Sequence, residues 1–470
     1  MPFADVSEIV SGNSADFFEI ISTYFIILVL MARIKPFCGI RYNTDLIKIE
    51  NVIAQPYDKI DLNMQKTYHH KSPYNIVRLI LGYDIPEPGQ ISDKYQRAGD
   101  LFTNWINTGI LHQDQDPSFY IYDQEYELND EYYRRLSLIA DVRLVEFSKG
   151  IILPHENTLS KPKEDRLKLL EKTKVNLELV FMLYRDSSME VNRMLQEYIK
   201  DEQSLFNIID DLGVRNRLWR LDNAALAGRI SAWFSDKKLY IADGHHRYES
   251  SVIYRNKMHK LEADDSEKPY DYIMSALVSI DDPALKILPT HRAVFGIDDF
   301  DPEDFLSKVS VNFDAIDCGQ SLNGLLEYMR IPEVMGQETA STRIGYFCED
   351  NGNFYVLKLK KGHKPEGLIV GPHSFDWKNL DVAVLHKIIL DGILGITEEK
   401  LRSQSNIKYV RELSELYDMV AEGEAQMAFV MNPTRTDQVR AICEQGEKMP
   451  QKSTDFYPKM LTGLVINPLT

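Results

Sequence analysis

The chain contains few cysteines and fewer basic than acidic residues. Its 470 residues include only four cysteines, which lie far apart and form no CxxC pair: Cys38, Cys318, Cys348 and Cys443. This spacing excludes a zinc ribbon and a disulfide scaffold, and it indicates a reducing, cytoplasmic environment. Lys and Arg number 54 against 71 Asp and Glu, so the net charge is −17. Such an acidic surface argues against nucleic-acid and membrane partners.

The common nucleotide-binding and hydrolase motifs are also absent. The sequence contains no GxxxxGK[ST], no GxGxxG after an expected strand, no HRD–DFG pair, no GxSxG and no HExxH. These absences exclude a Walker A loop and argue against a Rossmann dinucleotide site. A phosphate ligand would therefore be held by another arrangement of residues.

The N-terminal segment differs in composition from the rest of the chain. The first 32 residues contain no Lys or Arg, and an apolar run covers Ile20–Ala32. The run is shorter than the roughly 20 residues of a membrane helix, and it lacks the cationic start of a secretory signal. Met31 opens a sequence typical of the start of a folded domain. We expect residues 1–30 to be an extension outside the fold, with a functional anchor as the alternative.

Segments with strand and helix patterns alternate along the remaining chain. Residues 119–127 and 135–145 predict two antiparallel strands around the turn Asn129-Asp130. A second hairpin is predicted for 343–348 and 354–360, across Asn351-Gly352. With 44% hydrophobic residues and this mixture of elements, the sequence indicates an α/β fold with mixed (α+β) sheets.

The strongest candidate site is the segment Asp243–Arg247, with the sequence DGHHR. It follows an expected strand over 238–242 and precedes an expected helix over 248–257. A helix N-terminus offers unpaired N–H groups to an anion, glycine permits close approach, and arginine can bind phosphate or carboxylate with two hydrogen bonds. Asp243 is also a candidate cation ligand. The alternative is an aspartate helix cap with two surface histidines.

Two further segments carry chemically active side chains. Glu156, in the sequence PHENT, precedes an expected helix and suits a general base or a cation ligand. The alternative is that the segment is only the start of the helix, with no role in catalysis. Lys452-Ser453-Thr454, with Lys459, suits an anion, although lysines near a C-terminus are usually only solvated. The segments 56–58 and 288–292 are weaker candidates.

Seven segments, in order along the chain, together resemble the domain-of-unknown-function family 1015. These segments are Ala32–Phe37, Gln55–Asp58, Ser72–Arg78, Leu153–Glu156 with Lys161–Arg166, Ile241–Tyr248, Leu288–Arg292 and Met449–Thr454. The resemblance covers the chain from about Met31 to its C-terminus. It supports the interpretation of residues 1–30 as an addition to the domain.

Asp243–Arg247 is also similar to the signature of free-serine kinases built on the ParB/sulfiredoxin-like fold. The resemblance implies a ParB/sulfiredoxin-like catalytic core over 149–295, with additional α/β regions over 31–148 and 296–470. Some family members resemble serine kinases that use pyrophosphate. The implied reaction is therefore phosphoryl transfer to the hydroxyl of free L-serine, giving O-phosphoserine, with pyrophosphate, ATP or ADP as donor.

The same resemblance implies a role for individual residues. Glu156 would be the general base, with His246 and Asp243 as further catalytic residues. Mg²⁺ is the expected cofactor, with Asp243 as its ligand. The residues expected to contact substrate or phosphate are Gly244, His245, Arg247, His155, Lys163, Arg166, Lys452, Ser453 and Thr454. A ParB-like nucleic-acid-binding regulator and a non-catalytic phosphate or amino-acid sensor remain alternatives, and the sequence leaves the oligomeric state open.

Overall fold

The computed structural model describes residues 31–470 apart from 86–90, 265, 331–341 and 350–351. The prediction about residues 1–30 therefore lies outside the described residues. The contacts of the chain divide it into two compact units. Unit 1 comprises Met1–Leu153, Ser160–Asp282 and Met460–Thr470, and unit 2 comprises Pro154–Leu159 and Pro283–Lys459.

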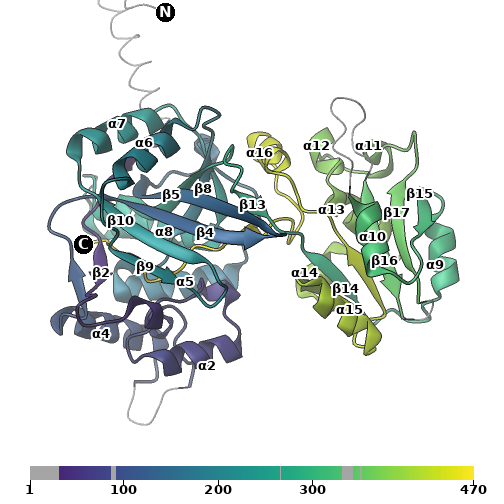
Figure 1. Ribbon diagram of the computed structural model, residues 1–470, viewed down its shortest axis with the longest axis horizontal. Helices are drawn as coiled ribbons and strands as arrows, with labels where there is room; N and C mark the ends of the chain where they lie inside the picture. The colour runs from purple at the N-terminus through teal and green to yellow at the C-terminus, as the bar shows by residue number, and fades with distance from the viewer. Residues whose placement is uncertain (1–30, 86–90, 265, 331–341, 350–351) are drawn as a thin grey trace, which may run out of the picture. The chain divides into compact units, whose positions relative to one another are not determined.

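Unit 1 is built on one nine-stranded mixed sheet with the order β6-β11-β8-β12-β5-β4-β10-β9, and β1 pairs with β5 at the side (Figure 1). Strands β8 and β12 run parallel, whereas β5 pairs antiparallel with both β4 and β12. The strands are β1 (Ile34–Lys35), β4 (Phe119–Leu128), β5 (Glu131–Arg143), β6 (Ile152–Pro154), β8 (Val180–Tyr184), β9 (Phe206–Ile209), β10 (Arg215–Leu221), β11 (Leu239–Asp243) and β12 (Tyr272–Ser279).

The hairpin of β4 and β5 confirms the prediction from the sequence. Its turn residues Asn129 and Asp130 have φ angles of 55° and 63°. Positive φ at both positions matches the twist of a two-residue hairpin, and Asn and Asp tolerate it better than most side chains. The two strands pair from Tyr120 with Ile139 to Leu128 with Glu131.

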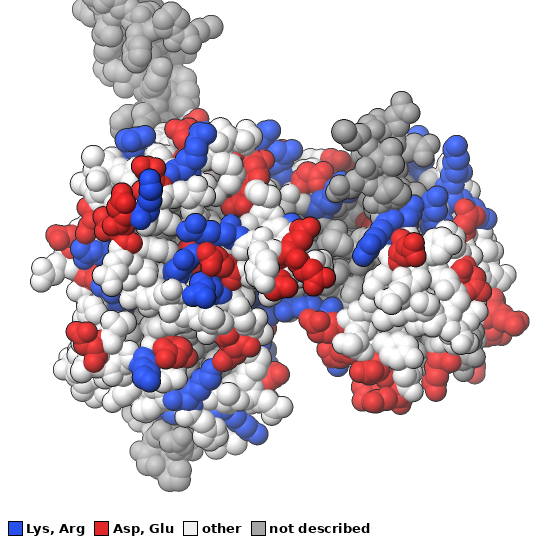
Figure 2. Space-filling view, in the orientation of Figure 1, with Lys and Arg blue, Asp and Glu red and all other residues white. Residues whose placement is uncertain are grey.

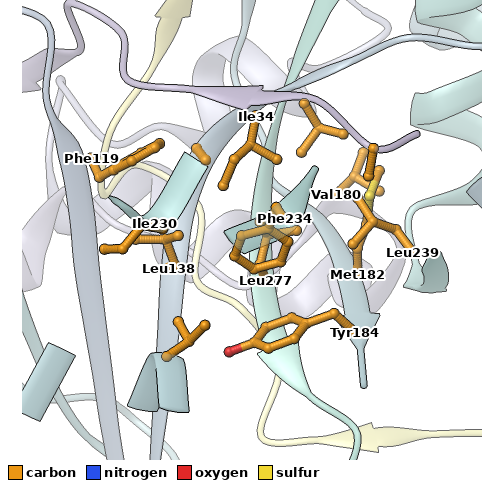
Figure 3. Packing of buried hydrophobic residues seen from close by; sticks show 14 of the residues in the cluster. Ile34, Phe119, Leu138, Val180, Met182, Tyr184, Ile230, Phe234, Leu239 and Leu277 are labelled. Carbon is orange, nitrogen blue, oxygen red and sulfur yellow. The ribbon is translucent and has the colours of Figure 1, made fainter. Parts of the chain in front are cut away.

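Helices α6 (Glu190–Ile199) and α7 (Ala224–Phe234) cover one face of this sheet. Figure 3 shows Ile230 and Phe234 of α7 packed against Leu138 of β5, Met182 of β8 and Leu277 of β12. Because side chains alternate across a strand, the residues on this face of β5 are every second one, from Leu136 to Val142. The apolar core of unit 1 lies between these helices and the sheet.

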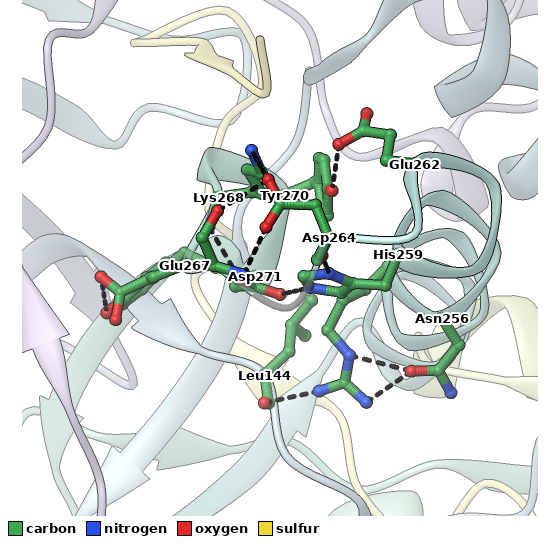
Figure 4. A network of polar contacts seen from close by, with 12 residues as sticks. Leu144, Asn256, His259, Glu262, Asp264, Glu267, Lys268, Tyr270 and Asp271 are labelled. Carbon is green, nitrogen blue, oxygen red and sulfur yellow. Dashed lines mark hydrogen bonds and ion pairs between the residues drawn. The ribbon is translucent and has the colours of Figure 1, made fainter.

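Helices α4 (Lys94–Asn107), α5 (Ser160–Thr173) and α8 (His245–Glu262) pack successively against one another. The α4 helix starts at Asp93, whose carboxylate accepts hydrogen bonds from Tyr95 N and Gln96 N, as expected for an N-cap aspartate. The C-terminal end of α8 is held by polar contacts (Figure 4): His259 Nε2 lies 2.6 Å from Asp271 Oδ1. These contacts fix the helix that begins at the DGHHR segment.

Unit 2 contains a separate six-stranded sheet, with the order β15-β17-β16-β19-β14-β18 and antiparallel pairing throughout. Helices α10 (Leu322–Met329) and α15 (Leu413–Ala421) bury their apolar residues on it. The pairing of β16 with β17 confirms the second predicted hairpin. The strands are β14 (His291–Val294), β15 (Phe313–Asp317), β16 (Arg343–Cys348), β17 (Phe354–Leu359), β18 (Ile407–Val410) and β19 (Met427–Val430).

The observed architecture confirms the expected α/β fold with mixed sheets. The two units differ from the regions expected at 31–148, 149–295 and 296–470. Residues before and after position 148 share the sheet of unit 1, because β5 pairs with β12 far along the chain. The last residues, Met460–Thr470, also belong to unit 1. Among the described residues, no helix has the length and apolar character needed to cross a membrane.

Candidate functional site

The DGHHR segment joins the end of β11 to the start of α8 in unit 1. Gly244 is the N-cap residue, with φ 93° and ψ 26°. This left-handed conformation favours glycine. Since Gly244 has no side chain, it cannot cap the first turn, and the 18-residue helix presents its N-terminal backbone N–H groups here. The structure thus has the strand–loop–helix geometry that the sequence predicted for an anion site.

Arg247 folds back against Gly244. A Cβ atom at position 244 would lie only 3.0 Å from Arg247 Nε, so a larger residue would displace the guanidinium. Arg247 Nη2 donates to Asp243 Oδ1 at 3.2 Å, and Nη1 donates to the carbonyl of Leu179. Its Nε is buried and has no hydrogen-bond partner among the described residues. The described part of the protein therefore leaves one buried donor of this arginine unsatisfied.

A buried carboxylate, Glu178, lies next to this arginine and also holds Arg166. Arg166 Nη1 donates to Glu178 Oε2 at 3.2 Å, and Tyr57 N donates to Glu178 Oε1 at 3.1 Å. The guanidinium of Arg166 lies over the Tyr57 ring, 4.0 Å from its centroid. Burial raises the pKa of Tyr57 to about 12, so its hydroxyl remains protonated at neutral pH.

Both arginines already have nearby negative charge. Burial works to lower the pKa of Arg247, but the charges of Glu178, Asp243 and Asp58 outweigh it and raise that pKa. The same balance, with Glu178 and Asp165 as the acids, raises the pKa of Arg166. A small cavity of about 40 Å³ lies between them, large enough for water and too small for a phosphate ester. An anion would therefore bind here by taking over hydrogen bonds now made to carboxylates.

The predicted residue Lys163 lies on α5 in the same unit. Its Nζ is 2.8 Å from Glu249 Oε2 of α8, and its carbonyl accepts a hydrogen bond from Ser250 Oγ. Lys163 thus links the two helices that carry Arg166 and Arg247. Glu178 and Tyr57 were not among the predicted site residues. Tyr57 lies in the segment 56–58, which the sequence gives only as a weaker candidate site. Glu178 lies in no motif of the sequence that would indicate a site.

The second predicted group, around Glu156, belongs to unit 2. The buried ring of His155 has its Nε2 2.8 Å from Thr454 Oγ1 and 3.8 Å from Glu156 Oε1. The backbone of the two segments is also joined, because Met449 N donates to the His155 carbonyl at 2.8 Å. The Glu156 side chain is 35% exposed and thus accessible to a substrate. The structure therefore brings together two candidates that lie about 300 positions apart in sequence.

Lys452 and Ser453 line a much larger cavity of about 880 Å³, which lies wholly within unit 2. Lys452 has a positive φ of 54°, and its carbonyl accepts a hydrogen bond from Arg292 at 3.2 Å. Ser453 Oγ donates to the Pro450 carbonyl at 2.5 Å. The predicted site residues therefore form a group around Arg247 in unit 1 and a group around His155 and Lys452 in unit 2.

The expected magnesium site rests on a single carboxylate, that of Asp243. In the described part of the chain, no group of three or more His, Cys, Asp or Glu side chains is placed to hold a metal. Asp243 supplies one carboxylate, and its Oδ1 already accepts a hydrogen bond from Arg247. Mg²⁺ commonly binds through one or two carboxylates together with substrate phosphates. The magnesium site at Asp243 therefore stays a prediction.

A family model described as "Protein of unknown function (DUF1015)" matches residues 34–383. The chain belongs to this family. The matched range includes the DGHHR segment and Glu156, and it ends before Lys452. The family name carries no activity, so the function must be argued from the residues.

No curated protein matches the chain. Solved structures similar to it include a conserved hypothetical protein from Pyrococcus furiosus, with 12% identity, 69% of this chain and 92% of that chain covered, and a TM-score of 0.30. A mutant free serine kinase in complex with ADP has 11% identity, with 68% and 87% covered and a TM-score of 0.32. A C-terminally truncated SbnI from Staphylococcus aureus has 12% identity, with 70% and 87% covered and a TM-score of 0.32. At these values the likeness carries no inference about this chain.

Proposed function

We propose that the protein transfers a phosphoryl group to the hydroxyl of free L-serine and releases O-phosphoserine. The observation that carries this proposal is the arrangement of Asp243, Gly244 and Arg247 between β11 and α8. It combines helix N–H groups, a left-handed glycine and a guanidinium with one buried, unsatisfied donor. Phosphoryl transfer depends mostly on positioning and on neutralising charge, which such groups supply.

Pyrophosphate is the donor that we propose first, with ATP and ADP as alternatives. The sequence has no motif that recognises a base or ribose, and pyrophosphate has neither. In the reaction the serine Oγ forms a bond to one phosphorus atom, the bridging P–O bond breaks, and inorganic phosphate leaves. The serine hydroxyl loses its proton to a general base, the role that the resemblance of the sequence assigns to Glu156.

The loop residues would hold the transferred group. Arg247, with His245, His246 and the first N–H groups of α8, would donate to the phosphoryl oxygens. Asp243 would orient a histidine or hold Mg²⁺ that arrives with the donor, although no step above depends on the metal. Lys163 and Arg166 would contact the substrate. In the structure Lys163 is hydrogen-bonded to Glu249 and Arg166 to Glu178, so the alternative role of both residues is to hold α5 in place.

The proposal is tested by measuring O-phosphoserine formed from L-serine with pyrophosphate, ATP and ADP in separate reactions. We expect product with one donor and little with the other two. Threonine and ethanolamine as alternative acceptors control for the recognition of free serine. Absence of phosphoserine with all three donors, for protein that is folded by circular dichroism, would overturn the assignment.

A further inference from the structure

The cavity of about 880 Å³ in unit 2 is large enough to enclose a metabolite. Its walls are formed by the end of β17, the following segment 360–366, and residues of α12 (Phe375–Lys378), α16 (Thr436–Glu444) and the loop around Lys452. Small-molecule sites usually measure about 300–1,000 Å³. Neither Glu156 nor the DGHHR segment lines this cavity.

Arg292 lines the cavity and is 1% exposed. Its Nη1 donates to the Thr290 carbonyl, its Nη2 donates to the Lys452 carbonyl at 3.2 Å, and its Nε has no partner among the described residues. No described carboxylate lies within 4.0 Å of its guanidinium, in contrast to Arg166. Buried charges are normally paired. An unmatched guanidinium in a cavity wall therefore indicates a ligand that supplies the negative charge.

The electrostatic surroundings of Arg292 strengthen this argument. Burial lowers the pKa of Arg292 to about 10, and Tyr409 is the one ionisable group that counteracts the shift. Burial, aided by the charge of Arg292, also lowers the pKa of His386 well below its usual range. His386 is therefore neutral, and its Nε2 lies 3.5 Å from Arg292 Nη2. Among the groups that shift the pKa of Arg292 in the described part of the chain, none is a carboxylate.

Cations outnumber carboxylates in the cavity wall. The cationic residues are Arg292, Lys358, Lys360, Lys361, Lys364, Arg435 and Lys452, and the acidic ones are Asp314, Glu366, Asp376, Asp381 and Asp437. Asp437 is paired with Arg435 at 3.0 Å, and burial raises the pKa of Asp381 to about 6. Lys361 and Lys364 have no ion-pair partner among the described residues. In a chain of net charge −17, this is a local excess of positive charge.

Figure 2 shows Lys and Arg along the upper part of this face of unit 2, whereas Asp and Glu are concentrated along its lower and outer edges. Of the residues that line the cavity, the segment 358–364 alone provides four lysines. The field of such a cluster raises the local concentration of an anionic ligand.

We propose that this cavity binds a phosphorylated small molecule with a polar, hydroxyl-rich body. The phosphate would receive donors from Arg292, Lys452 and the lysines of 358–364. The remaining wall offers hydroxyl and amide groups from Thr290, Thr342, Thr434, Ser453, Asn379, Asn432 and Gln438. Phe375 and His363 are the aromatic side chains among the lining residues, and the hydroxyl and amide groups outnumber them, which favours a sugar-like body over a stacked nucleobase. Lys452 and Ser453, expected from the sequence to contact substrate or phosphate, are assigned here to this ligand, and the assignment does not require serine phosphorylation.

The test is isothermal titration of the full chain with ribose 5-phosphate, with inorganic phosphate, ADP and ribose in parallel. We expect ribose 5-phosphate to bind more tightly than inorganic phosphate or ADP, and ribose alone not to bind. Binding should weaken as the salt concentration rises. Lack of binding by all three phosphate compounds, or equal binding of phosphate and ribose 5-phosphate, would overturn the proposed ligand class.

Two variants locate the binding. Arg292→Met should weaken ribose 5-phosphate binding at least tenfold, and Lys361→Ala, on the exposed rim, should weaken it several-fold without affecting folding. The matched control is Lys308→Ala, an exposed lysine on α9 (Pro302–Val309) that does not line the cavity and should leave the affinity unchanged. Equal affinities in all three variants would place the binding elsewhere. Because the readout is binding, the result is separate from whether phosphoserine forms.

Discussion

The arginines of unit 1 and the buried arginine of unit 2 differ in how their charge is balanced. Arg166 and Arg247 lie beside Glu178, Asp165 and Asp243, which raise the pKa of both arginines. Arg292 is more deeply buried, lines a large cavity and has no carboxylate partner among the described residues, and burial lowers its pKa.

A sequence motif does not distinguish two roles of a buried arginine. The arginine can pair with a negative charge of the protein, or it can pair with the negative charge of a ligand. In unit 1 an incoming phosphate must compete with carboxylates, which suits a site where a group is transferred and released. In unit 2 the guanidinium lacks such a partner, which suits retention of an anion.

The largest expected effect comes from breaking the charge balance in unit 1. Glu178→Gln keeps the shape of the side chain but leaves Arg166 and Arg247 without their shared carboxylate. Loss of one partner of a buried ion pair typically costs about 3–5 kcal/mol. We expect the free energy of unfolding of unit 1 to fall by that amount.

Urea unfolding followed by tryptophan fluorescence measures this change, because Trp105, Trp219 and Trp233 lie in unit 1. The matched control is Glu171→Gln, which removes a more exposed ion pair with Lys257 on the same pair of helices. Its cost should stay below about 1 kcal/mol. Equal effects of the two variants would mean that Glu178 is not the charge partner of the arginines.

The next largest effect is expected at Glu156. Glu156→Gln removes the basicity and keeps the size and polarity of the side chain. A positioned base typically contributes about 10²–10⁴-fold to the rate, so kcat for serine phosphorylation should fall by about a hundredfold or more. The KM for the donor should change little, because Glu156 is proposed to act on serine.

Arg247→Lys provides the contrasting variant. An ammonium cannot donate to Asp243 and to the Leu179 carbonyl as the guanidinium does, so donor binding should weaken and its KM should rise. Steady-state kinetics with serine and the active donor separate the two effects. Wild-type kcat in Glu156→Gln would place the base elsewhere.

Local elements could be predicted from the sequence because their signals are local. The turn Asn129-Asp130 and the hairpin of β16 and β17 depend on turn residues and alternation within a few positions.

Local patterns are less informative where contacts distant in sequence decide the structure. The run 76–81 is rich in β-branched residues but contains the short helix α3 (Val77–Ile80). There Asn75 Oδ1 accepts a hydrogen bond from Val77 N, and Ile76 N donates to the Val52 carbonyl far back in the chain.

The site could be predicted only in part, for the same reason. The strand–loop–helix geometry of β11, Gly244 and α8 follows from a short segment. The contact of Glu178 with Arg166 and the unmatched charge of Arg292 depend on pairings between strands and loops distant in sequence. Composition gives the net charge, but it does not show which arginine lacks a partner.

A smaller effect is expected when the unmatched charge of unit 2 is removed. Arg292→Met takes away a desolvated charge and keeps an apolar stem of similar length. Replacing buried charges by apolar groups is often neutral or stabilising, so stability should stay unchanged or rise by about 1 kcal/mol. Hydrogen exchange of β14 and β19 measures the change in unit 2. If Arg292→Met lowered the free energy of unfolding by more than about 2 kcal/mol, the charge of Arg292 would be balanced by the protein itself and not by a ligand.

The smallest effect is expected at His259, whose ion pair lies at the C-terminal end of α8. This pair is partly exposed, so its contribution to stability can be compared with that of the buried pairs. Its Nε2 lies 2.6 Å from Asp271 Oδ1 and its Nδ1 lies 2.7 Å from the Asp264 carbonyl (Figure 4). Both partners are acceptors, so both ring nitrogens must donate, and only the imidazolium does so. The hydrogen bonds to the Asp264 carbonyl and to Asp271 accordingly raise the pKa of His259.

Because the folded-state pKa is raised, the stabilisation is complete below the unfolded value of about 6.5 and is lost as the pH rises through the folded-state value. His259→Gln should therefore lower the free energy of unfolding by less than about 1 kcal/mol at pH 5.5 and by less still at pH 8.5. Urea unfolding at the two pH values measures both differences. His363→Gln, at an exposed histidine without a described acidic partner, is the control for replacing a histidine by glutamine. If the loss of unfolding free energy in His259→Gln grew with pH, the ion pair between His259 and Asp271 would be contradicted. If that loss were as large as in Glu178→Gln, the exposed ion pair and the buried one would not differ in strength.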